Sequence, residues 1–240
     1  MQLLRLLLSF VLAACIGLLA AGPSLAADVD LTTPEGAIAA YIDGVTRQDL
    51  SAIIATSSAD NMSKGFDFVA QVDRIRSLSP WTPAPASDPF FIEINKAGFV
   101  AQIAGQVKFL TYGLMTDKEI LTGRQVLMDA AGATDFASVI RADRLASLAL
   151  VKVGIPKPSL LNSEVNQKNA AKLAHIYGAD SSTDRVALLS FEGLHFMIGF
   201  SLLRYGENWT IMSQSSAFAG LSSMGVPKRV TPEEFEEMLK

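Results

Sequence analysis

The chain has 240 residues, of which 20 are Lys or Arg and 24 are Asp or Glu, so its net charge at pH 7 is −4. This acidic balance does not favour nucleic acid or an anionic membrane surface as a partner. The one cysteine, Cys15, lies in an apolar N-terminal segment. The rest of the chain therefore has no disulfide, thiolate metal site or cysteine nucleophile.

Residues 1–26 have the layout of a secretory signal, in which Arg5 precedes an apolar run and the small residues Ser24 and Ala26 form a cleavage site. We expect a bacterial host to export a mature chain of residues 27–240 to the periplasm or beyond. A second interpretation is a lipobox ending at Cys15, which would anchor a lipoprotein. The run is slightly short for the roughly 20 residues of a membrane span, and we expect no span after cleavage.

Residues 33–56 predict a helical hairpin. Thr33 is a favoured N-cap residue, and Pro34 suits the first helical position. Asp49 follows a charged turn and caps a second, shorter helix. The apolar face of the first helix consists of Ile38, Tyr41, Ile42 and Val45, which recur at helical spacing.

The middle of the chain predicts helices interrupted by a proline-rich loop. Residues 59–78 are weakly helical, and the four prolines within residues 79–89 predict a stiff, extended loop. Residues 89–94 predict a short strand. Helices are expected at residues 97–115, 117–130, 135–148 and 166–177.

The last third of the chain changes to the period of a strand. Three successive antiparallel strands are expected at residues 185–192, 194–205 and 209–215, with glycine-containing turns between them. The long apolar run of residues 186–203 contains charged and glycine residues, so two buried strands explain it better than a membrane span. Thr231 begins a C-terminal helix over residues 231–240.

Three short motifs at the two ends of the chain carry a family resemblance. They are Pro34-Glu35 at the start of the first helix, Gln48-Asp49-Leu50 in the following turn, and Trp209-Thr210-Ile211 after the last hairpin turn. Together they resemble secreted bacterial members of the NTF2-like (SnoaL-like, cystatin-like cone) superfamily. The resemblance implies an α+β fold, with a helical hairpin packed on a curved antiparallel sheet. Residues 27–240 would form one such domain, with a large helical insertion at about 97–177 and the C-terminal helix.

The resemblance also implies a pocket between the sheet and the first helices, where enzymes of the superfamily place an Asp or His as a general base. The candidates for such a base are His195 and Glu192. His195 has apolar neighbours, which favours a hydrogen-bonded core histidine, and a turn carboxylate such as Glu192 is more often solvated.

The candidates for ligand contacts are Tyr41, Trp81, Met197 and Trp209. In the proline-rich loop, Trp81 could act as a lid or a partner anchor, but filling of the protein's own core is the more frequent role of such a residue. The two histidines lie far apart and no motif has metal-ligand spacing, so we expect neither a metal nor a cofactor.

These features favour an exported, non-enzymatic protein that binds a small apolar molecule or an envelope protein. One alternative is an isomerase, dehydratase or cyclase that uses the pocket. A second alternative is an assembly or structural role in the cell envelope. The sequence is also compatible with a homodimer.

Overall fold

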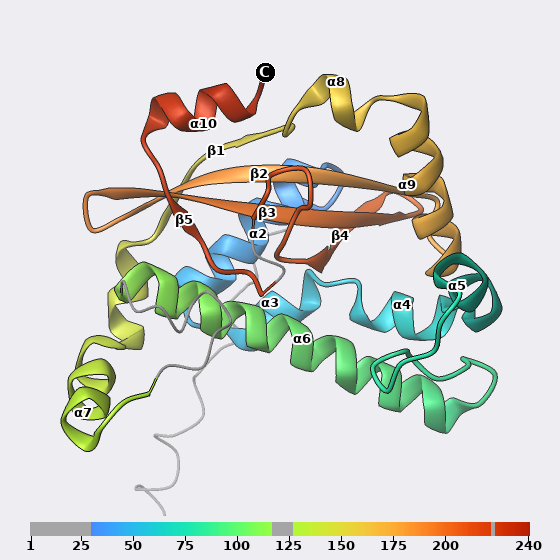
Figure 1. Ribbon diagram of the computed structural model, residues 1–240, viewed down its shortest axis with the longest axis horizontal. Helices are drawn as coiled ribbons and strands as arrows, with labels where there is room; N and C mark the ends of the chain where they lie inside the picture. The colour runs from blue at the N-terminus through green and yellow to red at the C-terminus, as the bar shows by residue number, and fades with distance from the viewer. Residues whose placement is uncertain (1–29, 117–126, 222–223) are drawn as a thin grey trace, which may run out of the picture.

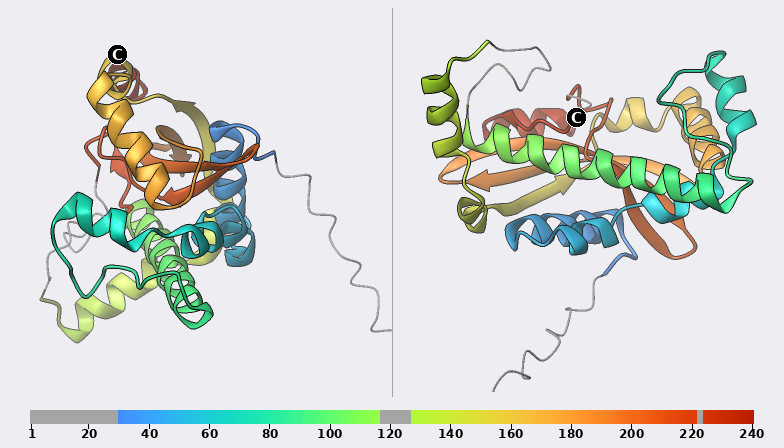
Figure 2. Two further views of the ribbon diagram at one scale, coloured as in Figure 1. Left: turned by 90° about the vertical axis from the view of Figure 1, so that its right-hand side faces the viewer. Right: turned by 90° about the horizontal axis from the view of Figure 1, so that it is seen from below.

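The computed structural model describes residues 30–116, 127–221 and 224–240. It has an α+β fold in which one antiparallel sheet carries helices on both faces (Figure 1, Figure 2). The predicted signal at residues 1–26, including Cys15, lies outside the described residues, as does most of the helix predicted at 117–130. Among the described residues, no helix combines the length and apolarity needed to cross a bilayer.

The sheet is built around one long hairpin, and the three strands predicted in the last third of the chain are confirmed. The hairpin strands pair in unbroken register from Phe191 and Leu194 at the turn to Ser181 and Arg204 at the far end. The sequence did not predict the edge strand at residues 149–154. Exposed and buried positions do not alternate in this strand, so it lacks the two-residue period by which the other strands are recognised. In sheet order the strands are β1 Ala149–Gly154, β2 Ser181–Phe191, β3 Leu194–Tyr205 and β4 Asn208–Ser213, with β5 Lys228–Arg229 also pairing with β3.

The first and the last described helix begin where their capping residues predict. The Thr33 hydroxyl accepts a hydrogen bond from the Gly36 amide, and Thr231 forms a capping box with Glu234. The described helices are α2 Pro34–Thr46, α3 Leu50–Ala55, α4 Ala59–Gly65, α5 Phe68–Ile75, α6 Pro89–Met115, α7 Ala130–Val139, the 3₁₀ helix η2 Ala142–Ser147, α8 Pro158–Leu161, α9 Glu164–Ile176 and α10 Pro232–Met238.

The short strand predicted at residues 89–94 is wrong, because these residues form the first turns of α6. The Asp88 side chain accepts a hydrogen bond from the Phe90 amide, and Pro89 occupies the first helical position. This local capping starts a helix at residues where a strand was expected. The helix predicted at 135–148 is also divided, since α7 ends at Val139 and η2 follows.

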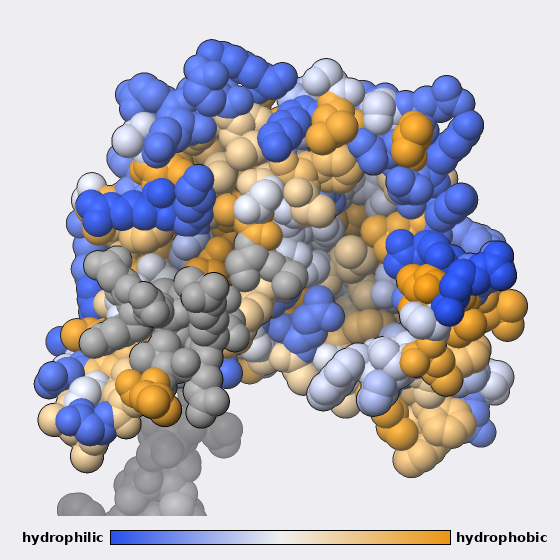
Figure 3. Space-filling model, viewed as in Figure 1, coloured by the Kyte–Doolittle hydropathy of each residue, from blue (hydrophilic) through white to orange (hydrophobic). Residues whose placement is uncertain are grey.

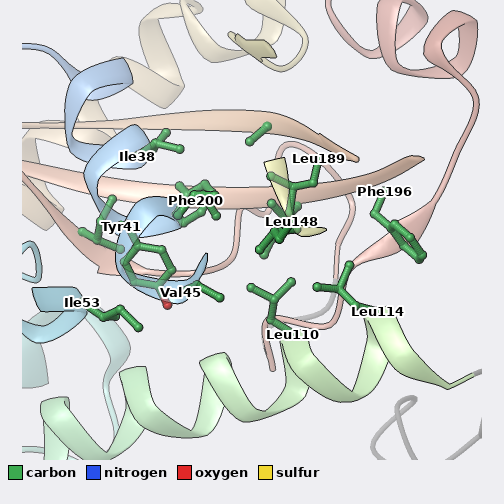
Figure 4. Packing of buried hydrophobic residues seen from close by; sticks show 14 of the residues in the cluster. Ile38, Tyr41, Val45, Ile53, Leu110, Leu114, Leu148, Leu189, Phe196 and Phe200 are labelled. Atoms are coloured by element: carbon green, nitrogen blue, oxygen red, sulfur yellow. The ribbon is translucent and has the colours of Figure 1, made fainter. Parts of the chain in front are cut away.

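Two hydrophobic cores lie on opposite faces of the sheet. The main core lies between the sheet and helices α2 and α6 (Figure 4). The second, smaller core lies under α10 and includes Met197 and Phe235. Helix α6 supplies Ile103, Leu110 and Leu114 to the main core, so part of the range predicted as an insertion forms a wall of the domain.

Candidate functional site

Packed side chains fill the region where the family resemblance implied a pocket. Tyr41 of α2 and Phe200 of β3 are both 0% exposed, and their rings meet edge to face at 5.5 Å. Figure 4 shows Ile38, Val45 and Leu110 around them, filling the space between α2, α6 and the sheet. Tyr41 is thus part of the main core, and burial raises the pKa of its phenol.

A buried polar network borders this core. The Tyr41 hydroxyl donates to Gln214 Oε1 at 2.8 Å, and the Gln214 amide nitrogen donates to the backbone carbonyls of Gln106 and Gly225. The Gln106 side chain in turn donates to Ser213 Oγ. These bonds satisfy the polar groups within the protein, so the network fastens α2 and α6 to the segment after β4.

Glu192, one of the two candidates for a general base, lies in the β2–β3 turn and forms an ion pair. Its carboxylate accepts hydrogen bonds from Arg144 Nε at 2.8 Å and Nη2 at 2.5 Å. The Arg144 guanidinium holds the pKa of Glu192 below its ordinary value. Because this arrangement favours the ionised and paired carboxylate, it does not prepare Glu192 for proton transfer.

His195, the other candidate, is half-buried near the start of β3 and belongs to neither core. Its strand partner is Ser190, and its backbone carbonyl accepts a hydrogen bond from the Val230 amide. A hollow of about 190 Å³ beside the hairpin turn is lined by Glu192 but not by His195. The structure therefore does not bring the two candidates together in one pocket.

The four candidates for ligand contacts lie in different layers of the protein. Tyr41 is in the main core, and Met197 is in the second core on the other face of the sheet. Trp209 is half-buried against the main core, and the Arg204 guanidinium lies 5.8 Å from its ring centroid. Trp81 is 91% exposed, so the prediction that it fills the protein's own core is wrong.

The exposed Trp81 belongs to a larger surface, which we call the apolar platform. The platform extends over α5, the proline-rich loop and the first turns of α6, where hydrophobic residues gather at the right-hand end of the molecule (Figure 3). Trp81 and Phe90 are its most exposed aromatic residues, at 91% and 68%. Its members are Val69, Ile75, Leu78, Trp81, Phe90, Phe91 and Ile94.

Hydrogen bonds hold the platform in a defined conformation. Asn95 of α6 is 5% exposed; its side chain accepts a 2.8 Å bond from the Ala84 amide and donates a 2.8 Å bond to the Ala84 carbonyl. This pair of bonds clamps the middle of the proline-rich loop onto the helix. Lys96 then joins α6 to Asp60 of α4 at 2.8 Å. The aromatic side chains are therefore presented on a segment that is already ordered, which lowers the entropic cost of binding a partner.

One pattern in the sequence indicates part of the platform, although a strand was expected there. Asp88-Pro89 is a helix-start pattern, and Phe90-Phe91 follow it directly, so both aromatics enter the first helical turn. The role of Asn95 has no local signal, because its partner Ala84 lies in a different element. Among the described residues, no group of three or more His, Cys, Asp or Glu side chains is placed to hold a metal.

Comparison with known proteins supports the fold alone. No protein-family model matches the chain, and no curated protein matches it significantly. A crystal structure of a cystatin-like protein from Ruminococcus gnavus ATCC 29149 is similar, with a TM-score of 0.57 and 13% sequence identity. The similarity covers 82% of this chain but 44% of that protein, so the chain spans less than half of that protein's length.

Proposed function

We propose that the protein is an exported, non-enzymatic member of the NTF2-like superfamily whose apolar platform binds another protein of the cell envelope. One observation carries this proposal: seven large apolar side chains are exposed within residues 69–94, and Asn95 clamps the proline-rich loop of this segment in place. Exposed apolar patches on ordered surfaces mark sites of interaction. Trp is also enriched among the residues that dominate binding energy at protein interfaces.

The size of the platform supports a protein partner. A whole aromatic side chain offers about 150 to 250 Å² of surface, so the exposed fractions of Trp81, Phe90 and Phe91 amount to about 400 Å². The four aliphatic members extend this area towards the roughly 800 Å² that each partner buries in a standard interface.

The charges around the platform favour an apolar partner surface over a strongly charged one. Arg76 lies 3.0 Å from Asp73, and Asp60 pairs with both Lys64 and Lys96. Residues 60–96 contain 5 acidic and 4 basic side chains in all, so the platform offers no large excess of either sign for long-range attraction. An anionic membrane surface is a poor match for the same reason.

The filled interior argues for this function over the enzymatic alternative. The buried pair of Tyr41 and Phe200 occupies the region where a substrate would bind in a cone-type enzyme. Glu192, the candidate base, is held by Arg144. The assembly role considered from the sequence is close to the proposed function, because both require a contact surface of this kind.

Site-specific photo-crosslinking in the native host tests the proposal. A photoreactive amino acid replaces Trp81, and a matched control replaces Val165, which is 68% exposed on α9 and outside the platform. We expect position 81, and not position 165, to yield an adduct with one other envelope protein. The purified partner should then bind saturably to the wild-type chain, and Trp81→Ala with Phe90→Ala should weaken that binding at least 100-fold, since hot-spot residues each contribute about 2 kcal/mol or more.

Several outcomes would contradict the proposal. Equal adducts at positions 81 and 165, or no adduct at 81, would remove the platform from consideration. An adduct of the protein with itself would assign the platform to a homodimer, and co-sedimentation with lipid vesicles that depends on Trp81 would assign it to a membrane. Export is tested separately by N-terminal sequencing, which should find Ala27 as the first residue and not a lipid-modified Cys15.

A further inference from the structure

A polar hollow lies on the opposite side of the sheet from the main core. It has a volume of about 160 Å³ and is formed by α9, the beginning of β2, Arg74 of α5 and the segment that contains Phe218. In Figure 1 this region is at the right-hand end of the sheet, where α9 crosses β2. The Ser182 hydroxyl donates a 2.9 Å hydrogen bond to the Ala170 carbonyl and fixes the helix against the strand there.

Asp184 supplies a largely buried carboxyl group to the wall of this hollow. The Ser216 hydroxyl donates to Asp184 Oδ2 at 2.7 Å, and burial raises the pKa of the carboxyl. The neighbouring cation, Arg185, attracts this carboxyl group and partly offsets the effect of burial on its pKa, but its ion pair is with Glu35, since its Nε lies 2.6 Å from Glu35 Oε1. Among the described residues Asp184 has no ion-pair partner, and a buried carboxylate in this condition gains from a cation that reaches it.

Arg74 supplies a positive charge to the same hollow. Its one hydrogen bond within the described chain is a long contact of 3.5 Å with Gln71 Oε1, and it forms no ion pair there. The side-chain amide of Asn169 lies in the same wall and makes no hydrogen bond to the described residues. A guanidinium and a free amide are suitable donors for a carboxylate.

The remaining wall is apolar. Leu161, Leu173 and Phe218 line the hollow together with the polar groups. The volume of about 160 Å³ is smaller than the roughly 300 to 1,000 Å³ of pockets for drug-sized ligands. A small ligand that carries a cation, an anion and a short apolar group matches this lining.

We propose that this hollow binds an aliphatic α-amino acid. Its ammonium group meets Asp184, its carboxylate meets Arg74 and Asn169, and its side chain lies against Leu161, Leu173 and Phe218. No member of the apolar platform lines the hollow, although Arg74 lies on α5 beside Ile75 of the platform, so amino-acid binding is measured on the purified protein without the proposed partner. It gives the protein a second, small-molecule binding activity.

Calorimetric titration of the purified protein with L-leucine and L-valine tests this inference. Leucinamide, which lacks the carboxylate, and 4-methylpentanoate, which lacks the ammonium group, are the matched probes. We expect saturable binding of at least one of the two amino acids, and binding weaker by at least ten-fold, or about 1.4 kcal/mol, for both probes. If neither amino acid binds, or if the probes bind as well as L-leucine, the proposal is overturned.

Two variants and two controls locate the binding in the hollow. Asp184→Asn and Arg74→Gln should each weaken amino-acid binding by at least ten-fold. Arg76→Gln is the matched control for Arg74, because Arg76 is on the same segment but does not line the hollow. Arg74 is exposed, so its substitution tests binding without disturbing the fold. Trp81→Ala should leave amino-acid binding unchanged, and unaltered binding in both Asp184→Asn and Arg74→Gln would refute the site.

Discussion

The hydroxyl of Tyr41 donates a 2.8 Å hydrogen bond to Gln214 Oε1, a residue 173 positions further along the chain. This bond connects the first described helix to the segment after the last long strand, inside a region without exposed surface. It shows that a residue proposed from the sequence as a ligand contact is a structural element of the filled interior.

Tyr41→Phe should destabilise the protein by about 1 to 3 kcal/mol. The substitution keeps the ring against Phe200 but leaves the buried Gln214 oxygen without its donor, and that loss carries the desolvation penalty of the oxygen. Chemical denaturation measures the change. Tyr112→Phe is the control, because that ring packs edge-on against Phe109 and Phe136, and its loss of a hydroxyl should cost less than about 0.5 kcal/mol. Equal effects in the two variants would contradict the role of the Tyr41–Gln214 bond.

Substitution of the two tryptophans by alanine should change the free energy of unfolding by different amounts. Trp209 is half-buried against the main core, so Trp209→Ala should cost about 1 to 3 kcal/mol. Trp81 is 91% exposed, so Trp81→Ala should change the free energy of unfolding by less than about 0.5 kcal/mol. Since the chain has only these 2 tryptophans, acrylamide quenching of Trp209→Phe reports Trp81 alone. Fluorescence that resists the quencher in that variant would place Trp81 inside the fold.

Asp184→Asn should stabilise the protein at neutral pH and have a smaller effect in acid. Burial raises the pKa of Asp184 above its ordinary value of 3.8. The folded state therefore holds this proton more tightly than the unfolded state does. The stability that the protonated Asp184 contributes is fully present below the pKa of this group in the unfolded chain. It is lost as the pH rises through the pKa of the group in the folded protein.

The measurement for Asp184 is the difference in free energy of unfolding between wild type and Asp184→Asn from pH 3 to pH 8. Using the difference removes the contributions of other carboxyl groups, such as Asp60, whose pKa is lowered by hydrogen bonds from Lys64 and Lys96. We expect the advantage of the variant to grow as the pH rises. A constant difference across this range would mean that Asp184 is solvated in the folded protein.

Glu192→Gln should lower stability at neutral pH, and the loss should vanish in acid. Hydrogen bonds from Arg144 depress the pKa of Glu192 below its ordinary value of 4.5. The stabilisation is therefore present above the unfolded pKa and disappears as the pH falls through the folded pKa. Because the pair is partly exposed, the effect should be small and should decrease with added salt. If the variant instead abolishes a measurable turnover without a change in stability, the enzymatic alternative regains support.

Local chemistry explains which elements could be predicted from the sequence. Thr33 and Thr231 start helices because a side-chain oxygen satisfies an amide only three residues away. The residues of β3 alternate between its two faces: Phe196, Ile198 and Phe200 lie in the main core, and Met197 lies in the second core. Both signals are contained in a few neighbouring residues, so the sequence by itself determined these elements.

The tertiary structure decided what those elements do. No local pattern shows that Trp81 is exposed, and the loop that carries it is held on α6 by hydrogen bonds between Ala84 and Asn95, 11 positions apart. The placement of Asp184 and Arg74 around one hollow likewise depends on how α5, α9 and β2 lie relative to one another. These arrangements are set by contacts between distant segments, and such contacts follow from the packing of whole faces and not from the spacing of residues along the chain.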